Sequence, residues 1–459
     1  MALLSYIKQR RSILFLGDIV LILAATELST WIRLGQSIQV FTVHTGASTF
    51  TLLLYLTMLY IFDLYSAARP GCTKDVCVRL AVAVGSAGVV SAVVFYSLPN
   101  WVLGRGIFLI QMALVMLLLA GWRWLFAALF SEPIGKTDIL IIGAGRSGRA
   151  LYSLFNNNDS PYRPVGFLDD DPNKLGTSVG LVPVLGTTDQ LVQIANRQKV
   201  SLAVLAITHD RPQNLIDRVI HARLKGLTIP NMPALYEELT GAIPVEHLRN
   251  DWLFFADGFN LLSKQYVQRI KRVVDFVTSS LILIISLPII LFTAAAIKLE
   301  SRGPVFFRQE RVGKDEVPFR VFKFRSMMEG AEADGAVWAS ENDPRVTRVG
   351  RVIRLLRIDE MPQIINVFRG EMSLIGPRPE RPEFVKKLEA HIPFYGIRHS
   401  VRPGITGWAQ VKYGYGASVE DALKKLEYDL FYLKNMSILL DIKILLKTIG
   451  VVLFGQGAR

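Results

Sequence analysis

The sequence predicts a membrane protein with three parts: a four-helix transmembrane bundle, a cytoplasmic Rossmann-like α/β domain, and a mixed, mainly helical C-terminal domain with a re-entrant membrane helix. Three observations predict this order. Four apolar stretches open the chain, a glycine-rich strand–turn–helix pattern follows them, and a fifth apolar stretch containing a proline precedes a basic region. The expected domains are 1–135, 136–262 and 263–459, with the re-entrant helix over 270–300.

The composition favours a membrane location and anionic partners. Of the 459 residues, 51% are hydrophobic and the formal net charge is +13. Such a chain suits lipid headgroups, phosphates or nucleic acid as partners, although the positive-inside rule accounts for part of the charge. The two cysteines, Cys72 and Cys77, exclude a disulfide framework, and their spacing without nearby ligands does not favour a zinc site.

The four N-terminal apolar stretches are long enough, or nearly so, to cross about 30 Å of hydrocarbon as helices. They cover 12–33, 48–65, 80–98 and 106–130. Lysine and arginine concentrate before the first stretch, between the second and third, and after the fourth. Because positively charged loops stay in the cytoplasm, both ends of the bundle are expected on that side.

A glycine pattern follows the bundle in "TDILIIGAGRSGRALYSLF" (137–155), which is typical of a strand, a tight turn and a helix. The turn allows a phosphate to approach the start of the helix, and an acidic run follows where a ribose-binding residue would lie. A nucleotide site and a spacer or assembly role both stay open. The glycines are Gly143, Gly145 and Gly148, the acids are Asp169 to Asp171, and further strands are expected at 164–171, 202–207 and 227–233.

The fifth apolar stretch, 276–297, is long enough to span a bilayer, but basic residues flank both of its ends. Pro288 kinks a helix because it removes a backbone hydrogen bond, and Ser286 can satisfy a freed backbone group. We expect a broken helix that enters and leaves on the same face, with an ordinary fifth span as the alternative. The pattern at 437–454 predicts another helix, either at the membrane interface or packed on the core.

Asp359 and Glu360 stand side by side in "RLLRIDEMPQ" (354–363), among apolar residues. Both carboxylates are harder to ionise in such a setting. Pro362 suits the first position of a helix that would end at Gly370, and the positive end of that helix would stabilise the charges. Helix capping is the simpler alternative, but capping needs only one acid.

Basic residues accumulate around this acidic pair. Three segments supply these cations. They are a strand-like run, an arginine series that repeats every third residue from Arg345 to Arg357, and a proline-rich loop at 376–381. Guanidinium groups on a rigid loop suit bidentate recognition of phosphate, whereas a solvated basic face is the alternative for the distal arginines of the series. The candidate phosphate-binding residues are Lys323, Arg325, Arg354, Arg378 and Arg381.

Two carboxylates among phosphate-seeking cations indicate phosphoryl chemistry. A carboxylate can attack phosphorus and form an acyl-phosphate intermediate. A hard divalent ion, most commonly Mg²⁺, would bridge a carboxylate and a diphosphate. The apolar helix that precedes the site in sequence implies that the second substrate is a lipid.

Six motifs of the C-terminal region carry a resemblance to a known family. They are "KRVVDF" (271–276), "SLP" (286–288), "GPVFFRQERVG" (303–313), "FKFRSM" (322–327), "IDEMPQIINVFRGEMSLIGPRPE" (358–380) and "RPGITGWAQV" (402–411). With these motifs, the region 265–455 resembles the bacterial sugar transferases, which are polyprenyl-phosphate hexose-1-phosphate transferases. The preceding spans and the α/β domain resemble the N-terminal extension of the large members of that family.

The resemblance implies transfer of hexose-1-phosphate from a UDP-hexose to undecaprenyl phosphate, with release of UMP, at the start of polysaccharide repeat-unit synthesis. It implies Asp359 as a covalent nucleophile, Glu360 as its acidic partner and Mg²⁺ held by both. Arg354 and Arg378 match family arginines. Asp429 matches a family acidic position, with a structural salt bridge as the alternative.

The same resemblance implies a location in the bacterial inner membrane, with the catalytic domain on the cytoplasmic face. The expected partners are UDP-hexose, undecaprenyl phosphate, the lipid bilayer and a second copy of the chain, with no nucleic acid. A membrane-bound nucleotide-sugar dehydratase or epimerase is one alternative, but it needs Tyr-x-x-x-Lys, and Tyr236 is followed by Thr240. A non-enzymatic scaffold for polysaccharide assembly is the other.

Overall fold

The computed structural model describes residues 2–35, 45–65, 74–97, 105–129, 136–156, 160–208, 212–248, 259, 265–328, 344–414, 416 and 418–453. Two compact units divide the chain: Met1–Ile139 with Tyr152–Val165, and Leu140–Leu151 with Gly166–Arg459. The predicted domain boundaries near 135 and 262 fall on residues outside this description, as does Cys72. The division into three domains therefore stays a prediction.

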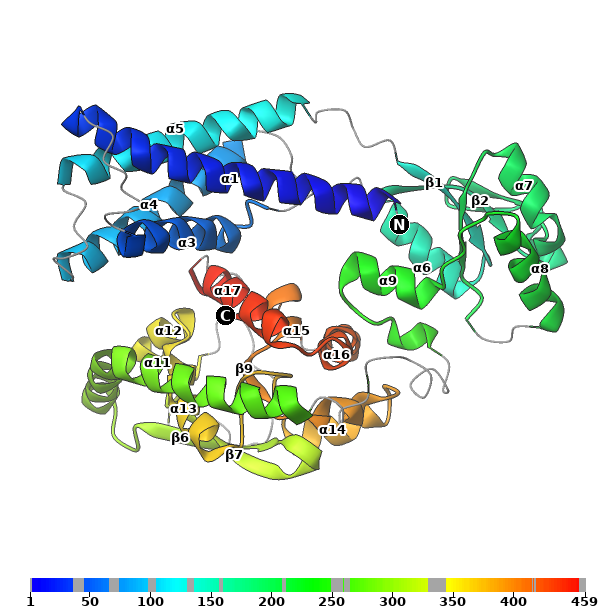
Figure 1. The fold of residues 1–459 in the computed structure, drawn as a ribbon. Coiled ribbons are helices and arrows are strands. Elements are labelled where there is room, and N and C mark those ends of the chain that lie inside the picture. Colours follow the sequence, from blue (N-terminus) through cyan, green and yellow to red (C-terminus); the bar gives the residue numbers. More distant parts are fainter. Residues whose placement is uncertain are drawn as a thin grey trace. The chain divides into compact units, whose positions relative to one another are not determined.

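The first unit contains four apolar helices, drawn from blue to cyan in Figure 1. A buried ion pair joins two of them, because Arg123 donates to both carboxylate oxygens of Asp18 at 2.7 and 2.8 Å. Two-point geometry of this kind satisfies charges that have no access to water. The helices are α1 (Ala2–Leu34), α3 (Thr45–Ile61), α4 (Lys74–Ser97) and α5 (Arg105–Leu129).

Four helices of the described residues are long and apolar enough to cross a membrane, which makes the chain a membrane protein. They are Ser12–Leu34, Val76–Phe95, Gly106–Leu129 and Tyr266–Glu300. Three of them match predicted N-terminal spans. The predicted second span, 48–65, is shorter than expected because α3 ends at Ile61 after 17 residues, which is the lower limit for crossing a bilayer.

A five-stranded sheet in the order β3-β4-β2-β1-β5 forms the mixed α/β region. β4 pairs in parallel with β2, and β3 pairs antiparallel with β4. The segment predicted as a strand at 227–233 makes only single bridges, at Thr228 and Asn231. The strands are β1 (Thr137–Ile142), β2 (Tyr162–Leu168), β3 (Ser178–Val179), β4 (Val182–Gly186) and β5 (Leu202–Leu205), and the helices are α6 (Arg146–Phe155), α7 (Leu191–Arg197), α8 (Gln213–Leu224) and α9 (Met232–Thr240).

The glycine-rich turn after β1 packs tightly on itself. Gly143 has a left-handed φ of +108°, and a Cβ on Gly148 would lie only 2.0 Å from the Gly143 carbonyl oxygen. The backbone N–H of Ala144 donates to Asp169 at 2.7 Å. One N–H of the turn is thus directed at a carboxylate of the protein itself. Gly145 has open space around it, and nucleotide binding by this turn stays a prediction.

The remaining acids of the predicted ribose-binding run also have partners within the protein. Asp170 accepts from the backbone and hydroxyl of Thr188, both at 2.7 Å. Asp171 accepts from the backbone N–H of Asn173 and caps the short helix η2 (Pro172–Lys174). These acids stabilise the loop that follows β2.

The C-terminal region of the second unit is mainly helical, as predicted, with two small sheets. It begins with α11 (Gln265–Glu300) and an antiparallel hairpin of β6 (Phe306–Val312), η5 (Lys314–Glu316) and β7 (Pro318–Phe324). It continues through α12 (Arg348–Leu355), η6 (Ile358–Gln363), α13 (Ile364–Arg369), β8 (Ser373–Ile375), α14 (Pro382–Glu389), η7 (Tyr395–Ser400), β9 (Gly404–Thr406), α15 (Trp408–Lys412), α16 (Val419–Lys434) and α17 (Ile438–Leu453).

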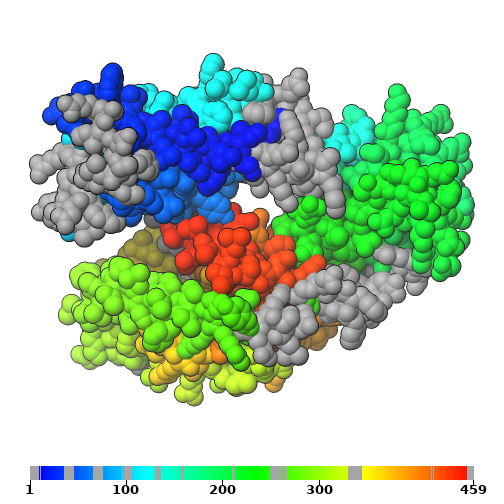
Figure 2. Space-filling view, in the orientation of Figure 1, coloured from blue at the N-terminus to red at the C-terminus, as the bar shows by residue number. Residues whose placement is uncertain are grey.

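The helix α11 has two distinct faces. Ser279, Ser286 and Thr293 recur every seven residues and are buried, whereas Ile285 and Phe292 are 67% and 77% exposed. In Figure 2, α11 contributes green atoms to the surface of this unit. One face therefore packs on the C-terminal region, and the other is suited to lipid.

The helix runs without interruption through Pro288. The predicted break at Ser286 and Pro288 is thus not a gap in the helix, and the Ser286 hydroxyl donates to the Leu283 carbonyl at 3.4 Å. A proline inside a helix removes one hydrogen bond and bends the helix, which need not end there. A return of α11 to the same membrane face stays a prediction.

The C-terminal helix α17 packs on the core and also exposes apolar residues. Its buried Asp441 accepts from Lys271 of α11 at 2.6 Å and from Tyr432 of α16 at 2.8 Å. Ile444 is fully buried, whereas Leu439 is 78% exposed. Of the two alternatives drawn from the sequence, core packing is observed.

We predict that Leu430→Ala lowers the free energy of unfolding by about 2–5 kcal/mol, because the Leu430 side chain lies fully buried in the core of this region and its truncation leaves a cavity. Thermal unfolding of the full chain in lipid nanodiscs measures the effect. Val419→Ala on the same helix is the control, since Val419 is 41% exposed and should change stability by about 0.5 kcal/mol or less. Equal effects of the two variants would contradict the packing described.

Candidate active site

Asp359 and Glu360 lie on the 3₁₀ turn η6, between α12 and α13. The predicted end of the following helix at Gly370 is confirmed, since Gly370 has a φ of +81°. The helix α13 starts at Ile364, slightly after the predicted start at Pro362. Its N-cap, Gln363, makes no side-chain capping bond, and both oxygens of Glu360 accept bonds from other side chains. The capping alternative therefore receives no support.

Glu360 is held by two cations from distant parts of the chain. Its Oε1 accepts from Nζ of Lys323 at 2.9 Å and from Nη2 of Arg378 at 2.6 Å. Its Oε2 accepts from Nη1 of Arg378 at 3.4 Å. Lys323 is the penultimate residue of β7, and Arg378 lies in the loop after β8. The structure thus brings together three predicted site residues separated by up to 55 positions in the sequence.

The cations determine how Glu360 ionises. Burial alone would raise the pKa of Glu360, but the charges of Arg378 and Lys323 outweigh burial and hold the pKa well below its usual value. In turn, the charge of Glu360 raises the pKa of Arg378. Burial lowers the pKa of Lys323, although Glu360 opposes that shift. Glu360 is therefore a charged anchor for the two cations.

Asp359 has a different environment from its neighbour. Within the part of the chain that the structure describes, its carboxylate makes no hydrogen bond or ion pair. Burial and the charge of Glu360 raise the pKa of Asp359, while Lys323 and Arg354 oppose the increase. A carboxylate with a raised pKa and no bonded partner is more basic and more available for reaction than Glu360.

The loop that carries Arg378 is fixed by close backbone packing and a buried ion pair. A Cβ on Gly376 would lie 2.5 Å from the Arg402 carbonyl oxygen, so only glycine fits there. Arg398 donates to the Arg378 carbonyl at 2.9 Å and pairs with Asp429 at 2.8 Å. Of the two alternatives for Asp429, the structural salt bridge is observed.

The other predicted cations have different positions. Arg354 donates to the Ser326 hydroxyl at 3.0 Å, and its charge acts on Asp359. Arg325 donates to the carbonyl groups of Ser301 and Arg302 at the end of α11. Arg381 pairs with Glu383 at 3.8 Å. The structure brings Lys323 and Arg378 to Glu360 directly, but it does not bring Arg325 into contact with the acidic pair.

Arg311 is a residue beside the site that the sequence analysis did not select. It donates to the Pro379 carbonyl at 3.1 Å and lies 3.6 Å from Glu380. Burial lowers the pKa of Arg311, against the charge of Glu380. No pattern local to 303–313 indicates this contact, because it depends on how β6 packs against the loop after β8.

We predict that Glu360→Gln destabilises the protein at neutral pH by about 2 kcal/mol or more, because two cations lose their charged partner. The loss of stability should be smaller than for a fully buried ion pair, because the Arg378 side chain is 38% exposed to solvent. A carboxylate with a lowered pKa stabilises the folded state above its unfolded pKa, and this contribution is lost as the pH falls through the folded pKa. The difference in thermal stability between wild type and variant should therefore shrink as the pH falls below about 4.5.

The matched control for this prediction is Glu383→Gln, because Glu383 is 62% exposed in a loose pair. Its loss should cost at most about 1 kcal/mol. If the difference in thermal stability between wild type and Glu360→Gln stays constant from pH 7 to pH 3, Glu360 is not held ionised by Lys323 and Arg378.

Comparisons with known proteins identify families and relatives that this chain resembles. The bacterial sugar transferase family matches residues 266–455, and a CoA-binding domain family matches residues 60–221. An Aeromonas hydrophila UDP-N-acetylgalactosamine-undecaprenyl-phosphate N-acetylgalactosaminephosphotransferase is 48% identical over 51% of this chain and 55% of its own length. This chain therefore spans about half the length of that relative.

Two longer matches extend beyond the C-terminal region. An undecaprenyl-phosphate glucose phosphotransferase from Komagataeibacter xylinus is 34% identical over 80% of this chain and 73% of its own length. A UDP-glucose:undecaprenyl-phosphate glucose-1-phosphate transferase from Escherichia coli is 34% identical over 72% of this chain and 69% of its own length. The chain therefore belongs to the bacterial sugar transferase family of enzymes.

Proposed function

We propose that the chain transfers hexose-1-phosphate from a UDP-sugar to undecaprenyl phosphate, with release of UMP, through a covalent intermediate on Asp359. The observation that carries this proposal is the asymmetry of the acidic pair. Glu360 is bound by Lys323 and Arg378, whereas the Asp359 carboxylate has no bonded partner among the described residues. The names of the relatives support the substrate classes.

In the first step, an Asp359 carboxylate oxygen attacks the phosphorus that bears the sugar. A new bond forms between that oxygen and phosphorus, and the bond from phosphorus to the bridging oxygen breaks. The bridging oxygen keeps the electron pair and leaves as part of UMP. The raised pKa of Asp359 strengthens this attack at any pH where the group is ionised.

In the second step, a phosphate oxygen of undecaprenyl phosphate attacks the same phosphorus. The bond to Asp359 breaks, the carboxylate is restored, and the lipid phosphate gains a sugar-1-phosphate, so that a diphosphate links sugar and lipid. The charges of Lys323 and Arg354 act on Asp359, and those of Arg378 and Lys323 act on Glu360. They would stabilise the charge on the transferring phosphoryl group in both steps.

The acidic pair also fits the predicted Mg²⁺. Hard divalent ions prefer carboxylate oxygens, and Asp359 offers both of its oxygens, while Glu360 Oε2 accepts only one long bond of 3.4 Å. We propose that Asp359 and Glu360 hold the ion. When bound, Mg²⁺ disperses the negative charge of a diphosphate.

We further propose that α11 re-enters the cytoplasmic face of a bacterial inner membrane and that the site lies at this face. The exposed apolar surface of α11 supports contact with lipid, as do the exposed Val352 and Leu355 beside Arg351 on α12. The α/β region is proposed to be a Rossmann-like accessory domain, and the product would start a polysaccharide repeat unit. Pairing of two copies stays a prediction.

The dehydratase or epimerase alternative is less well supported. The Tyr236 hydroxyl lies 3.2 Å from Glu427 and 3.4 Å from Lys424, both on α16. This tyrosine therefore joins the α/β region to the C-terminal region, and α16 binds its hydroxyl group.

We predict that Asp359→Asn lowers the rates of UMP release and of lipid-linked sugar formation by at least about a thousandfold. The thermal stability of the variant should stay close to that of the wild type. Asparagine keeps the size of the side chain but removes the nucleophilic carboxylate. The assay supplies a panel of UDP-sugars to the full chain in nanodiscs, with and without undecaprenyl phosphate.

With donor alone, the wild type should release one UMP per active site and carry a sugar-phosphate adduct on the peptide that contains residue 359. Transfer at a near-normal rate by Asp359→Asn would rule out the covalent mechanism. If the folded wild type uses none of the UDP-sugars in the panel as a donor, the scaffold alternative would be favoured.

We predict that both ends of α11 are accessible from the cytoplasm only. Tyr266→Cys and Glu310→Cys, each made after replacement of Cys72 and Cys77 by serine, place single thiols at exposed positions in the first turn of α11 and in β6, which follows its other end. A membrane-impermeant maleimide should label both in inside-out vesicles and neither in spheroplasts. Labelling of Glu310→Cys in spheroplasts would show an ordinary fifth span.

A further inference from the structure

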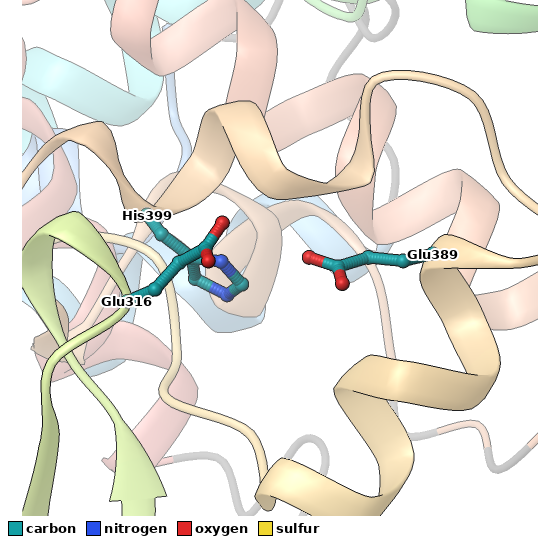
Figure 3. Close-up of side chains that lie close together, drawn as sticks. All are labelled: Glu316, Glu389 and His399. Atoms are coloured by element: carbon teal, nitrogen blue, oxygen red, sulfur yellow. The ribbon is translucent and has the colours of Figure 1, made fainter.

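Glu316, Glu389 and His399 form a cluster on the C-terminal region of the second unit (Figure 3). They come from three elements: η5 at the tip of the β6–β7 hairpin, the last residue of α14, and η7. One ligand atom from each lies within 4.8 Å of the other two. None of the three belongs to the acidic pair or to the cations around it.

The two carboxylates converge without a cation between them. A Cβ placed on Gly396 would lie 3.3 Å from Glu389 Oε1 and 3.4 Å from Glu316 Oε1, so both oxygens face the same point of the backbone. Over the described residues, neither glutamate makes a hydrogen bond or an ion pair. Burial and the charge of Glu316 raise the pKa of Glu389. Two like charges at this distance repel unless a cation joins them.

His399 supplies the independent observation that points to a ligand. Its side chain is buried, with 7% relative exposure, and its Nδ1 has no hydrogen-bond partner in the structure as described. Buried polar atoms are nearly always satisfied, so an unsatisfied one suggests a missing ion or water. Burial and the neighbouring Arg398 lower the pKa of His399 to about 4, so the ring is neutral at physiological pH and able to bind a metal.

We propose that Glu316, Glu389 and His399 form a binding site for a divalent transition-metal ion of the Zn²⁺ class. One imidazole and two carboxylates are typical ligands for such an ion, whereas Mg²⁺ and Ca²⁺ favour oxygen ligands alone. A tetrahedral ion needs ligand atoms about 3.4 Å apart, given bonds of about 2.1 Å. The two glutamates are exposed and can close the remaining distance by rotation of their side chains.

The position of the cluster suggests a structural effect of the ion. His399 follows Arg398, which donates to the Arg378 carbonyl and pairs with Asp429. An ion bound by the three residues would tie the hairpin tip and the end of α14 to the η7 segment that carries Arg398. It would therefore stabilise the loop that carries Arg378 through Arg398, without contacting the substrate.

The test is Zn²⁺ binding to the full chain in nanodiscs, without a histidine tag and after chelator treatment. Excess Mg²⁺ is present to compete with Zn²⁺ for the acidic pair. Competition with a fluorescent chelator should show one tight Zn²⁺ per chain, and X-ray absorption should show one imidazole nitrogen among oxygen ligands. Thermal stability should rise on addition of Zn²⁺.

Glu316→Gln and Glu389→Gln should each weaken Zn²⁺ binding by more than about tenfold. Loss of a residue that only hydrogen-bonds a metal ligand already costs about tenfold or more in affinity, and loss of a ligand should cost at least as much. His399→Gln should remove the imidazole signal. Glu310→Gln is the matched control, since Glu310 is an exposed glutamate on the same hairpin and lies outside the cluster.

The proposal is overturned if the wild type binds no stoichiometric Zn²⁺, if Mg²⁺ displaces the ion, or if both glutamine variants bind Zn²⁺ like the wild type. Because both glutamates are exposed, loss of folding is not expected to obscure these two variants. The readout is metal binding, so the result does not depend on the proposed transferase reaction.

Discussion

The ion-paired carboxylate of Glu360 is the interaction on which the site depends. It joins Lys323 from the β6–β7 hairpin to Arg378 from the loop after β8, with Oε1 shared between the two cations. A buried carboxylate is costly unless it is paired and hydrogen-bonded. The same pairing fixes both cations next to Asp359. The contacts that offset the cost of burying Glu360 thus also place two cations beside Asp359.

Adjacent carboxylates become chemically different because their surroundings differ. Glu360 carries the bonds to cations and keeps a low pKa, while Asp359 keeps its oxygens unbonded within the described region and has a raised pKa. Neighbouring acids with opposite pKa shifts are commonly divided between a structural and a reactive role. Such a division is what we propose for Glu360 and Asp359.

Much of this arrangement was predictable from the sequence, because local patterns determine it. Glycine and proline signals placed the end of α13 at Gly370, and Lys323, Arg378 and the acidic pair were selected together. Arg325 shows the limit of such reasoning. Alternation along a strand puts residues 323 and 325 on one face, but β7 ends at Phe324, so the Arg325 side chain turns to the carbonyl groups at the end of α11.

Interactions between distant segments were not predictable in the same way. The Arg398–Asp429 pair and the contact of Arg311 with the Pro379 carbonyl depend on how three elements pack, and no local spacing indicates them. They nonetheless bear on the site, because Arg398 and Arg311 donate to backbone carbonyls of the loop that carries Arg378. Lys323 and Arg378 already share the charge of Glu360, and Arg311 shares that of Glu380. Each of these three cations is therefore partly neutralised by a carboxylate of the protein itself.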